Sequence, residues 1–323
     1  MKVLVLGGAG YIGSHMVKVL VSAGHEVVTV DSLVTGHRDA VVGGTFLCGD
    51  IGDRAFLSSV FAQSSFDGVM HFAAFSQVGE SVRDPAKYYR NNCANALTLL
   101  DEMVAAGVRN IIFSSTAAIF GEPRYTPIDE DHPTAPINPY GRSKLFVEQA
   151  LQDYDRAYGL RSVSLRYFNA AGADAAAGLG ERHEPETHLI PLVLQVATGR
   201  REAIQVFGTD YPTPDGTCVR DYIHVSDLCN AHVLALEYLM SGGETTACNL
   251  GIGNGFSVGE VIHTVRKLTG RPIKVIAQGR REGDPAVLIA NSGLARSRLG
   301  WSPHYTSLES MIGSAWEWEL RRG

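Results

Sequence analysis

The stretch that decides the fold is residues 2–31, KVLVLGGAGYIGSHMVKVLVSAGHEVVTVD. Residues 2–8 form an apolar run that is typical of a buried strand, and residues 10–24 have the pattern of a helix that ends at Gly24. Residues 25–31 then form a second apolar strand. Because a helix that joins two strands in this way makes a βαβ unit, the stretch predicts two parallel strands.

The glycines between the first strand and the helix indicate a dinucleotide site. Gly7, Gly10 and Gly13 fit the spacing G-x-x-G-x-x-G, and Gly8, Gly10 and Gly13 fit G-x-G-x-x-G. Glycines in this place permit a tight turn and let the backbone approach a pyrophosphate at the positive end of a helix. A glycine-rich turn without a ligand is the ordinary alternative, and the position between strand and helix argues against it.

Asp31 ends the second strand, where a carboxylate can accept hydrogen bonds from an adenosine ribose and repel a 2′-phosphate. This position favours NAD over NADP as the cofactor. Arg38 leaves some room for a phosphate, but a carboxylate in the ribose position disfavours NADP more than a neighbouring arginine favours it. Residues 31–36, DSLVTG, also have a loop composition, so a strand-end turn is the alternative role for Asp31.

The same alternation of strands and helices continues, with further strands near Val69, Ile111 and Val163. It predicts an α/β fold, a Rossmann-type doubly wound parallel sheet with helices on both faces. Beyond Asn169 the chain becomes rich in alanine, glycine and charge, which marks a domain crossing. We expect an NAD-binding domain at residues 1–170 and a smaller C-terminal α/β substrate domain at residues 171–323. Residues 224–252 can pack back on the first domain, and helices are expected at residues 189–198 and 257–268.

The composition excludes several classes of partner. The chain has 323 residues and a net charge of −6, which gives no basic surface for nucleic acid. No apolar run reaches the length of a membrane span, and the start is too short for a signal sequence. The five cysteines are scattered without a C-x-x-C pair, so we expect a reducing compartment, the cytoplasm, and no structural zinc. Residues 182–188, RHEPETH, place two histidines near Glu184 and Glu186 but lack zinc-site spacing, so we expect no metal.

Residues 138–144, NPYGRSK, contain a candidate pair for proton transfer. Pro139 can begin a helix, which places Tyr140 and Lys144 on one face, one turn apart. Such a pair alone is more often solvated helix surface. An ammonium group and the positive ring of NAD can together lower a tyrosine pKa from about 10 to about 7, and the tyrosine is then a usable general base.

Residues 113–121, FSSTAAIFG, support the catalytic interpretation of this pair. They place hydroxyl groups at the carboxyl end of a parallel strand, which is the edge where ligands bind in such sheets. Thr116, or alternatively Ser114 or Ser115, is the candidate to hydrogen-bond the reacting oxygen. The sequence therefore predicts a tyrosine, a lysine and a hydroxyl beside a bound dinucleotide.

Two sets of motifs resemble known families. GGAGYIG, STAAIFG and YGRSK resemble the extended short-chain dehydrogenase/reductase superfamily, and VGESVRDPAKYYRNN, LRYFNAAGA, FGTDYPTPDGTCVRDYIHV and RREGDPA resemble the UDP-glucose 4-epimerase family over nearly the whole chain. The resemblance implies that Tyr140 removes the proton of the sugar 4-OH while hydride passes from C4 to NAD. Lys144 would hold the nicotinamide ribose and lower the pKa of Tyr140, and Thr116 would assist. The 4-keto sugar would then turn and take the hydride on its opposite face, which interconverts UDP-glucose and UDP-galactose.

The resemblance also assigns binding residues. The expected NAD contacts are Gly7, Gly10, Tyr11, Ile12, Gly13, Asp31, Asp50, Ile51, Phe72, Ala73, Ala74, Asn92, Tyr140, Lys144 and Phe168. The expected contacts of the nucleotide sugar are Thr116, Asn169, His188, Leu189, Phe207, Arg220, Arg281, Asp284 and Leu288. Two arginines can grip a diphosphate, an aromatic ring can stack on uracil, and a carboxylate can bind ribose hydroxyls, so these residue types suit the ligand.

Several alternatives remain open at this stage. Leu288 stands where relatives carry either a bulky tyrosine or a small cysteine, so a UDP-N-acetylhexosamine is an alternative substrate, and a UDP-uronate is another. Ala117 and Ala118 stand where 4,6-dehydratases carry the Asp-Glu pair that elimination needs, which argues against that reaction.

A non-catalytic NAD-sensing protein is the alternative from a different class, and the joint presence of Tyr140, Lys144 and Thr116 argues against it. The resemblance further implies a homodimer, formed through the helices that follow Asn92 and Tyr140 as a four-helix contact.

Overall fold

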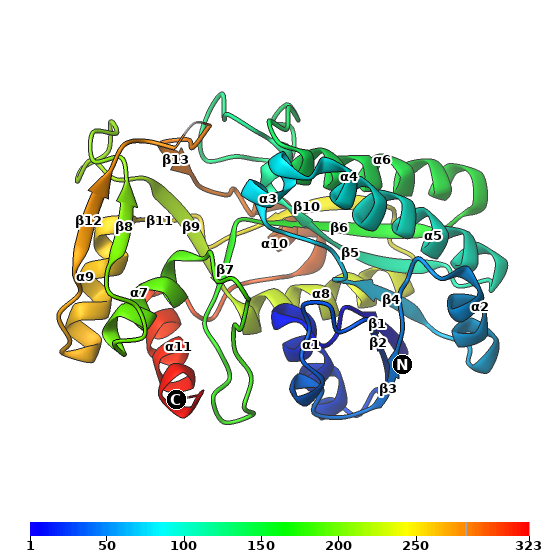
Figure 1. The fold of residues 1–323 in the computed structure, drawn as a ribbon. Helices are drawn as coiled ribbons and strands as arrows, with labels where there is room; N and C mark the ends of the chain where they lie inside the picture. The colour runs from blue at the N-terminus through cyan, green and yellow to red at the C-terminus, as the bar shows by residue number, and fades with distance from the viewer. Residues whose placement is uncertain (282, 323) are drawn as a thin grey trace.

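The centre of the computed structural model, which describes residues 1–281 and 283–322, is a seven-stranded sheet in the order β10-β6-β5-β4-β1-β2-β3 (Figure 1). All neighbouring strands are parallel. The strands are β1 (Lys2–Leu6), β2 (Glu26–Asp31), β3 (Thr45–Cys48), β4 (Gly68–His71), β5 (Asn110–Thr116), β6 (Arg161–Tyr167) and β10 (Thr246–Leu250). The predicted doubly wound parallel sheet is confirmed.

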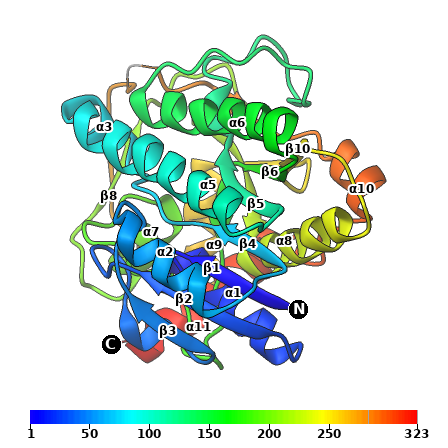
Figure 2. The ribbon, with the colours of Figure 1, turned by 90° about the vertical axis from the view of Figure 1, so that its right-hand side faces the viewer.

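Helices cover both faces of this sheet (Figure 2). One face packs against α1 (Tyr11–Ser22), α8 (Val225–Met240) and α10 (Gly293–Leu299), and the other against α2 (Arg54–Gln63), α5 (Asn95–Ala105) and α6 (Pro139–Tyr158). The alternation of side chains along β1 explains why both faces need cover. Val3 and Val5 belong to one core cluster, whereas Leu4 and Leu6 belong to the other.

A second, smaller unit lies beside the sheet and has its own apolar core. Its strands are β7 (Asn169–Ala171), β8 (Ile204–Phe207), β9 (Val219–His224), β11 (Gly255–Ser257), β12 (Val275–Gln278) and β13 (Val287–Leu288). Its helices are α7 (Leu189–Ala197), α9 (Val258–Thr269) and α11 (Leu308–Arg322). The short elements elsewhere are η1 (Arg38–Ala40), α3 (Val78–Arg83), α4 (Pro85–Tyr88), η2 (Tyr89–Ala94) and η3 (Ala117–Ile119).

The chain crosses between the two units several times. β10 and α8 follow residue 170, yet β10 pairs with β6 and α8 packs against β5 and β6. β7 and β9 pair with each other in the smaller sheet. The expected division of the chain into domains at residue 170 stays a prediction. Within the described part of the chain, the helices are all too short or too polar to cross a membrane.

A buried carboxylate joins three segments where the two units meet. Asp221 on β9 accepts hydrogen bonds from the backbone N–H groups of Ile252 (2.9 Å), Gly253 (3.0 Å) and Ala290 (3.1 Å). Burial raises the pKa of Asp221 to about 6, although the backbone donors oppose the shift. The side chain therefore ties the segment after β10 and the segment after β13 to β9.

Replacing Asp221 by asparagine tests this junction. The asparagine amide has only one acceptor oxygen. Its NH2 group would therefore face a backbone N–H that donates to a carboxylate oxygen in the wild type. We expect Asp221→Asn to lower the free energy of unfolding by about 1–3 kcal/mol, measured by urea denaturation. Asp153→Asn, at a side chain that is 76% exposed on α6, is the control and should leave the midpoint unchanged. Equal midpoints for the two variants would contradict the role of Asp221.

Candidate active site

The glycine loop lies at the carboxyl edge of β1, where the chain turns into α1. Gly7 has a φ of +77°, and a Cβ atom on Gly13 would lie 2.1 Å from the carbonyl oxygen of Gly7. The helix can therefore start this close to the strand only with glycine at these positions. Gly10 is the N-cap of α1 and has no side chain, so nothing on it screens the first N–H groups of the helix. This loop can hold an anion such as a pyrophosphate.

Asp31 lies at the end of β2 beside this loop. Its two carboxylate oxygens accept hydrogen bonds from the backbone N–H of Ala9 (2.9 Å) and of Leu33 (2.8 Å). These bonds fix the carboxylate at the position expected for a ribose contact. Arg38 packs over the ring of Phe46, 4.4 Å from its centre. The arginine that left room for a 2′-phosphate thus has another partner.

The other expected cofactor residues follow neighbouring strands. Asp50 and Ile51 come after β3, and residues 72–74 come after β4, so they share the carboxyl edge with the glycine loop. Asn92 contributes in a different way. Its side chain accepts from the N–H of Phe75 (3.0 Å) and donates to the carbonyl of Phe75 (3.0 Å) and to Ser143 Oγ (3.1 Å). It therefore braces the loop after β4 against α6.

Tyr140 and Lys144 lie at the start of α6, as the sequence predicts. Asn138 caps this helix by accepting from the N–H of Gly141 at 2.8 Å. Lys144 is buried, and its Nζ donates to the carbonyl oxygen of Ser114 at 2.8 Å, near the end of β5. The alternative interpretation is that the pair lies on a solvated helix surface. Lys144 does not fit that interpretation, because its side chain is buried.

The three candidate hydroxyl groups at the end of β5 have different partners. Ser114 Oγ lies 2.7 Å from the Tyr167 hydroxyl, and Ser115 Oγ donates to Glu148 at 2.5 Å. Thr116 Oγ1 accepts from the N–H of Ala118 at 3.1 Å, and Thr116 is close enough to the Tyr140 phenol to lower its pKa. Among the three, Thr116 therefore fits the assisting role best.

The protein chain by itself does not make Tyr140 a base near neutral pH. Burial raises the pKa of the Tyr140 phenol, and the hydrogen bond from Thr116 opposes that shift. Burial also lowers the pKa of Lys144 to about 8, against the attraction of Cys93 and Glu148. The direction for Tyr140 is opposite to the lowering expected with NAD bound. A positive ring placed next to the phenol would supply the missing charge.

The sequence analysis missed the buried ion pair that anchors α6. Glu148 lies one turn beyond Lys144 and accepts hydrogen bonds from Arg166 of β6. Arg166 Nε donates to both carboxylate oxygens at 3.1 Å, and a terminal guanidinium nitrogen donates to one of them at 2.6 Å. Both side chains are less than a tenth exposed. A carboxylate four residues beyond the lysine was visible in the sequence, but its partner on β6 was not. The pair fixes the face of α6 that points to the sheet.

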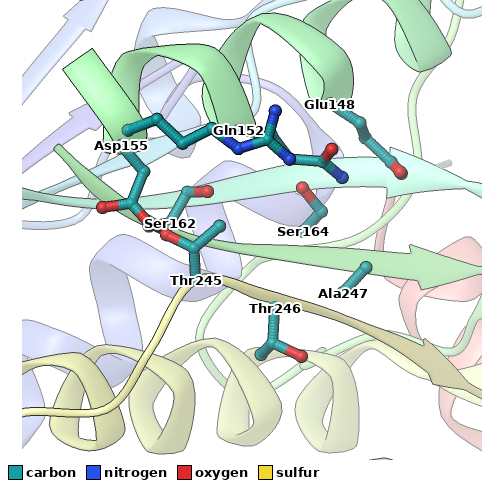
Figure 3. Close-up of a pocket in the computed structure, with 9 residues that line it drawn as sticks. Glu148, Gln152, Asp155, Ser162, Ser164, Thr245, Thr246 and Ala247 are labelled. Atoms are coloured by element: carbon teal, nitrogen blue, oxygen red, sulfur yellow. Dashed lines mark hydrogen bonds between the residues drawn. The ribbon is translucent and has the colours of Figure 1, made fainter. Parts of the chain in front are cut away.

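A cavity of about 250 Å³ lies beyond this ion pair, between α6 and the strands β6 and β10 (Figure 3). Glu148, Gln152, Ser162 and Thr246 are among its lining residues. Ser162 is the second residue of β6 and Thr246 is the first residue of β10, so the cavity lies toward the amino ends of these strands. The expected ligand residues lie at the opposite edge.

The expected nucleotide-sugar residues gather in the smaller unit, where several contact each other. Arg220 forms an ion pair with Asp284, and the guanidinium of Arg281 lies over the ring of Phe207, 3.8 Å from its centre. Leu288 on β13 stands opposite Arg220 in the parallel register. A ligand that binds to these residues would replace the contacts that they make with one another.

Phe168 and Leu288 lie near the candidate catalytic residue Thr116. Both pack against a small apolar cluster that includes Ala117 and Phe120, directly after Thr116. Asn169 Nδ2 donates to the carbonyl of Asp221 at 3.0 Å. These contacts bring the two sets of expected residues to one place at the junction of the units.

His188 and Leu189 mark the start of α7. His188 is the N-cap residue, and its Nδ1 lies 2.6 Å from Glu181 and 3.2 Å from Glu186. Tyr11, expected at the cofactor, donates its hydroxyl to the carbonyl of Gly172 at 2.6 Å. The segment before α7 therefore lies close to the glycine loop.

Comparison with known proteins agrees with this arrangement. The model of the NAD dependent epimerase/dehydratase family matches residues 3–251. Two similar curated proteins are the UDP-glucose 4-epimerases of Lacticaseibacillus casei (53% identity; 98% of this chain, 96% of the relative) and Streptomyces lividans (56% identity; 98% and 95%). The crystal structure of UDP-glucose 4-epimerase from Brucella ovis in complex with NAD superimposes with a TM-score of 0.96 at 50% identity and covers 98% of this chain and 97% of that one.

The shifted pKa of Lys144 predicts how stability depends on pH. The folded value of about 8 lies below the ordinary value of 10.5, so folding disfavours the charged amine. As pH rises from 8 to 10 the folded protein loses this proton first, and the penalty disappears. We expect the wild type to gain unfolding free energy over this range relative to Lys144→Met, on the order of 1–3 kcal/mol. Urea denaturation of both proteins at pH 7, 8, 9 and 10 measures the difference, and a constant gap would contradict the shift.

Proposed function

Since the chain belongs to the NAD dependent epimerase/dehydratase family, we propose that it interconverts UDP-glucose and UDP-galactose. It is an isomerase that uses NAD. The relatives at 53% and 56% identity over nearly the whole chain are UDP-glucose 4-epimerases. The structural observation that carries the proposal is the placement of Tyr140, Lys144 and Thr116 together at the carboxyl edge of the sheet, beside the glycine loop.

The cofactor residues proposed above divide by task. The N–H groups at the start of α1 hold the pyrophosphate, and Asp31 binds the adenosine ribose. Residues 50–51 and 72–74, at the ends of β3 and β4, line the same edge. Bound NAD supplies a hydride acceptor that becomes a hydride donor in the second half of the reaction.

Tyr140 moves the proton in both halves of the reaction. Its phenolate oxygen takes the proton of the sugar 4-OH while the C4–H bond breaks and hydride leaves, which produces a 4-keto sugar. Tyr140 returns that proton to the oxygen when hydride comes back to the other face of C4. Lys144 holds the nicotinamide ribose and lowers the pKa of Tyr140, and Thr116 assists the proton transfer at the reacting oxygen. Atoms and electrons balance, since nothing is gained or lost over one cycle.

In the structure, several of the proposed nucleotide-sugar residues contact one another, and these contacts must break when the ligand binds. Arg220 and Arg281 would move from Asp284 and Phe207 to the diphosphate, which a guanidinium binds with two parallel hydrogen bonds. Phe207 is then free to stack on uracil, and Asp284 is free to bind ribose hydroxyls. The remaining proposed contacts are Asn169, His188, Leu189 and Leu288.

The other reactions considered have less support. Ala117 and Ala118 begin η3 directly after Thr116, and methyl side chains cannot supply the acid and base of an elimination. UDP-N-acetylhexosamines and UDP-uronates are not favoured, because the relatives named above are UDP-glucose epimerases. A non-catalytic NAD sensor would not need the buried Lys144 amine, whose charge burial disfavours.

The test is conversion of UDP-galactose to UDP-glucose by the purified protein without added NAD, followed by proton NMR. We expect an equilibrium mixture of the two sugars from the wild type. Tyr140→Phe should retain NAD but lose about 10²–10⁴-fold in kcat, since it lacks the proton-transfer group. Tyr158→Phe is the matched control on the same helix, because its side chain is exposed, and it should turn over normally.

Two results would contradict the proposal in different ways. Normal turnover by Tyr140→Phe would remove Tyr140 from the mechanism. No conversion by the wild type, even after NAD is added, would shift the substrate to another nucleotide sugar and leave the fold and the cofactor standing.

We further propose a homodimer in the cytoplasm, a location suggested by five unpaired cysteines. Large apolar side chains are exposed on α3, η2 and α6, and α6 contacts both of the other elements. They are Val78, Val82, Tyr89 and Phe146. Such a patch is suited to a second copy of the chain.

Phe146, which is 42% exposed, offers a direct test of this contact. A charge placed in an apolar interface carries a desolvation cost, so Phe146→Glu should convert the dimer to a monomer. Light scattering during gel filtration measures the mass. Tyr125→Glu, at an exposed residue far along the chain from the patch, is the control and should remain a dimer. A monomeric wild type, or a dimeric Phe146→Glu, would contradict the proposal.

A further inference from the structure

Four side chains just before α7 converge on one point. They are Glu181, His183, Glu186 and His188, called here the 181–188 cluster, and one potential ligand atom from each lies within 4.8 Å of all the others. The sequence analysis predicted no metal here, because residues 182–188 lack the spacing of a zinc site, and it named Glu184 and Glu186 as the neighbouring carboxylates. In the structure Glu184 is exposed and outside the cluster, and Glu181 takes the fourth position.

We propose that the 181–188 cluster binds one divalent transition-metal ion, with Zn²⁺ the best match. Two imidazole nitrogens and two carboxylates are ligands that zinc accepts. With metal–ligand distances of about 2.0–2.2 Å, ligand atoms around a tetrahedral zinc lie about 3.3 Å apart.

The distances in the cluster bracket that value. His188 Nδ1 lies 2.6 Å from Glu181 and 3.2 Å from Glu186, and His183 Nδ1 lies 3.0 Å from Glu181 and 3.9 Å from Glu186. The four ligand atoms lie within 4.8 Å of one another, so side-chain movements of about 1–2 Å would bring them to the spacing of a tetrahedral site. Side-chain rotation alone can supply a shift of this size.

Charge is the second argument for an ion. The side chains of Glu181 and Glu186 are only 8% and 5% exposed. Within the described residues, neither carboxylate forms an ion pair with a lysine or an arginine, and Arg182 between them pairs with Asp39 instead. A buried carboxylate needs a cation or a set of donors to offset its lost hydration; Glu186 has two backbone N–H donors, whereas the partners of Glu181 among the described residues are the two histidines. One divalent ion neutralises both carboxylates and leaves the histidines in the neutral form that binds metals.

The ordinary alternative is a network of hydrogen bonds, because both Nδ1 atoms lie near Glu181. In that network burial opposes a charge on His188, but Glu181 and Glu186 raise its pKa to about 10, so a protonated His188 offsets one of the two carboxylates. The network also does not join His183 to Glu186, because the 3.9 Å between His183 Nδ1 and the Glu186 carboxylate is too long for a hydrogen bond. A shared ion accounts for the convergence of all four side chains.

The surroundings hold the cluster rigidly from both units. His37 Nε2 lies 3.0 Å from the carbonyl of Arg182, and Trp318 Nε1 donates to the carbonyl of Glu181 at 3.4 Å. Glu186 is oriented by the N–H groups of Thr187 (2.7 Å) and His188 (2.9 Å), which bind one of its oxygens. Such outer contacts orient metal ligands. An ion here would fix the segment between the glycine loop and α7, and it would leave Nε2 of His188 free.

Zinc binding to the NAD-containing protein tests the proposal. After dialysis against a chelator, Zn²⁺ is titrated by calorimetry, and we expect one ion per chain. Glu181→Gln and His183→Gln should bind at least about tenfold more weakly, because each removes a ligand. Glu184→Gln is the matched control, with the same loss of charge in the same segment, and it should bind like the wild type. Anomalous diffraction at the zinc edge should place the ion between the four side chains.

Three outcomes would overturn the proposal. They are no binding by the wild type, equal binding by all four proteins, which would indicate an adventitious ion only, and an anomalous peak elsewhere. His183 is partly exposed, so His183→Gln should fold even where Glu181→Gln does not, and circular dichroism with retained NAD absorbance checks both. These measurements need no substrate, so their failure would leave the proposed epimerase activity untouched.

Discussion

The buried ion pair between Glu148 and Arg166 is the interaction on which the active-site geometry depends. Removing two charges from water is costly, and only a well-formed pair offsets the cost, so α6 has one stable rotation against the sheet. In that rotation Lys144, one turn earlier, meets the end of β5, and Tyr140, two turns earlier, meets Thr116. Val147 and Leu151 of the same helix are buried in the core, so the apolar packing and the ion pair together set the position of Lys144 and Tyr140.

The same low-dielectric environment explains why the protein is incomplete as a catalyst without its cofactor. Burial raises the pKa of Tyr140 and lowers that of Lys144, so both shifts favour the neutral forms. A positive ring beside the phenol would reverse the first shift and would be strong there because little water screens it. The base would thus be competent mainly when the hydride acceptor is present. In the proposed mechanism, proton removal by Tyr140 and hydride transfer to NAD would thus be coupled by electrostatics.

The sequence predicted those features that depend on local pattern. The βαβ unit, the glycine turn and the helix that begins at Pro139 each follow from residues within one or two turns of each other. It could not predict features that depend on distant partners, such as Arg166 for Glu148; it anticipated that residues 224–252 return to the first domain but not which strand β10 pairs with. The pKa of Tyr140 belongs to this second class, because burial is a property of the folded chain. Site residues that contact each other, such as Arg281 over Phe207, were equally hidden.

Buried polar groups such as Asp221 lie where the two units meet, which is also where the substrate is proposed to bind. A substrate that must be oxidised, turned and reduced within one site has to be held by its nucleotide while its sugar remains free. The anchoring groups must then be rigid, whereas the space around the sugar must not be. In the proposed site, Asp221 and the segment before α7 would contribute this rigidity, since each fixes backbone through several hydrogen bonds. The apolar cluster beside Leu288 satisfies the second, because such contacts have no preferred direction.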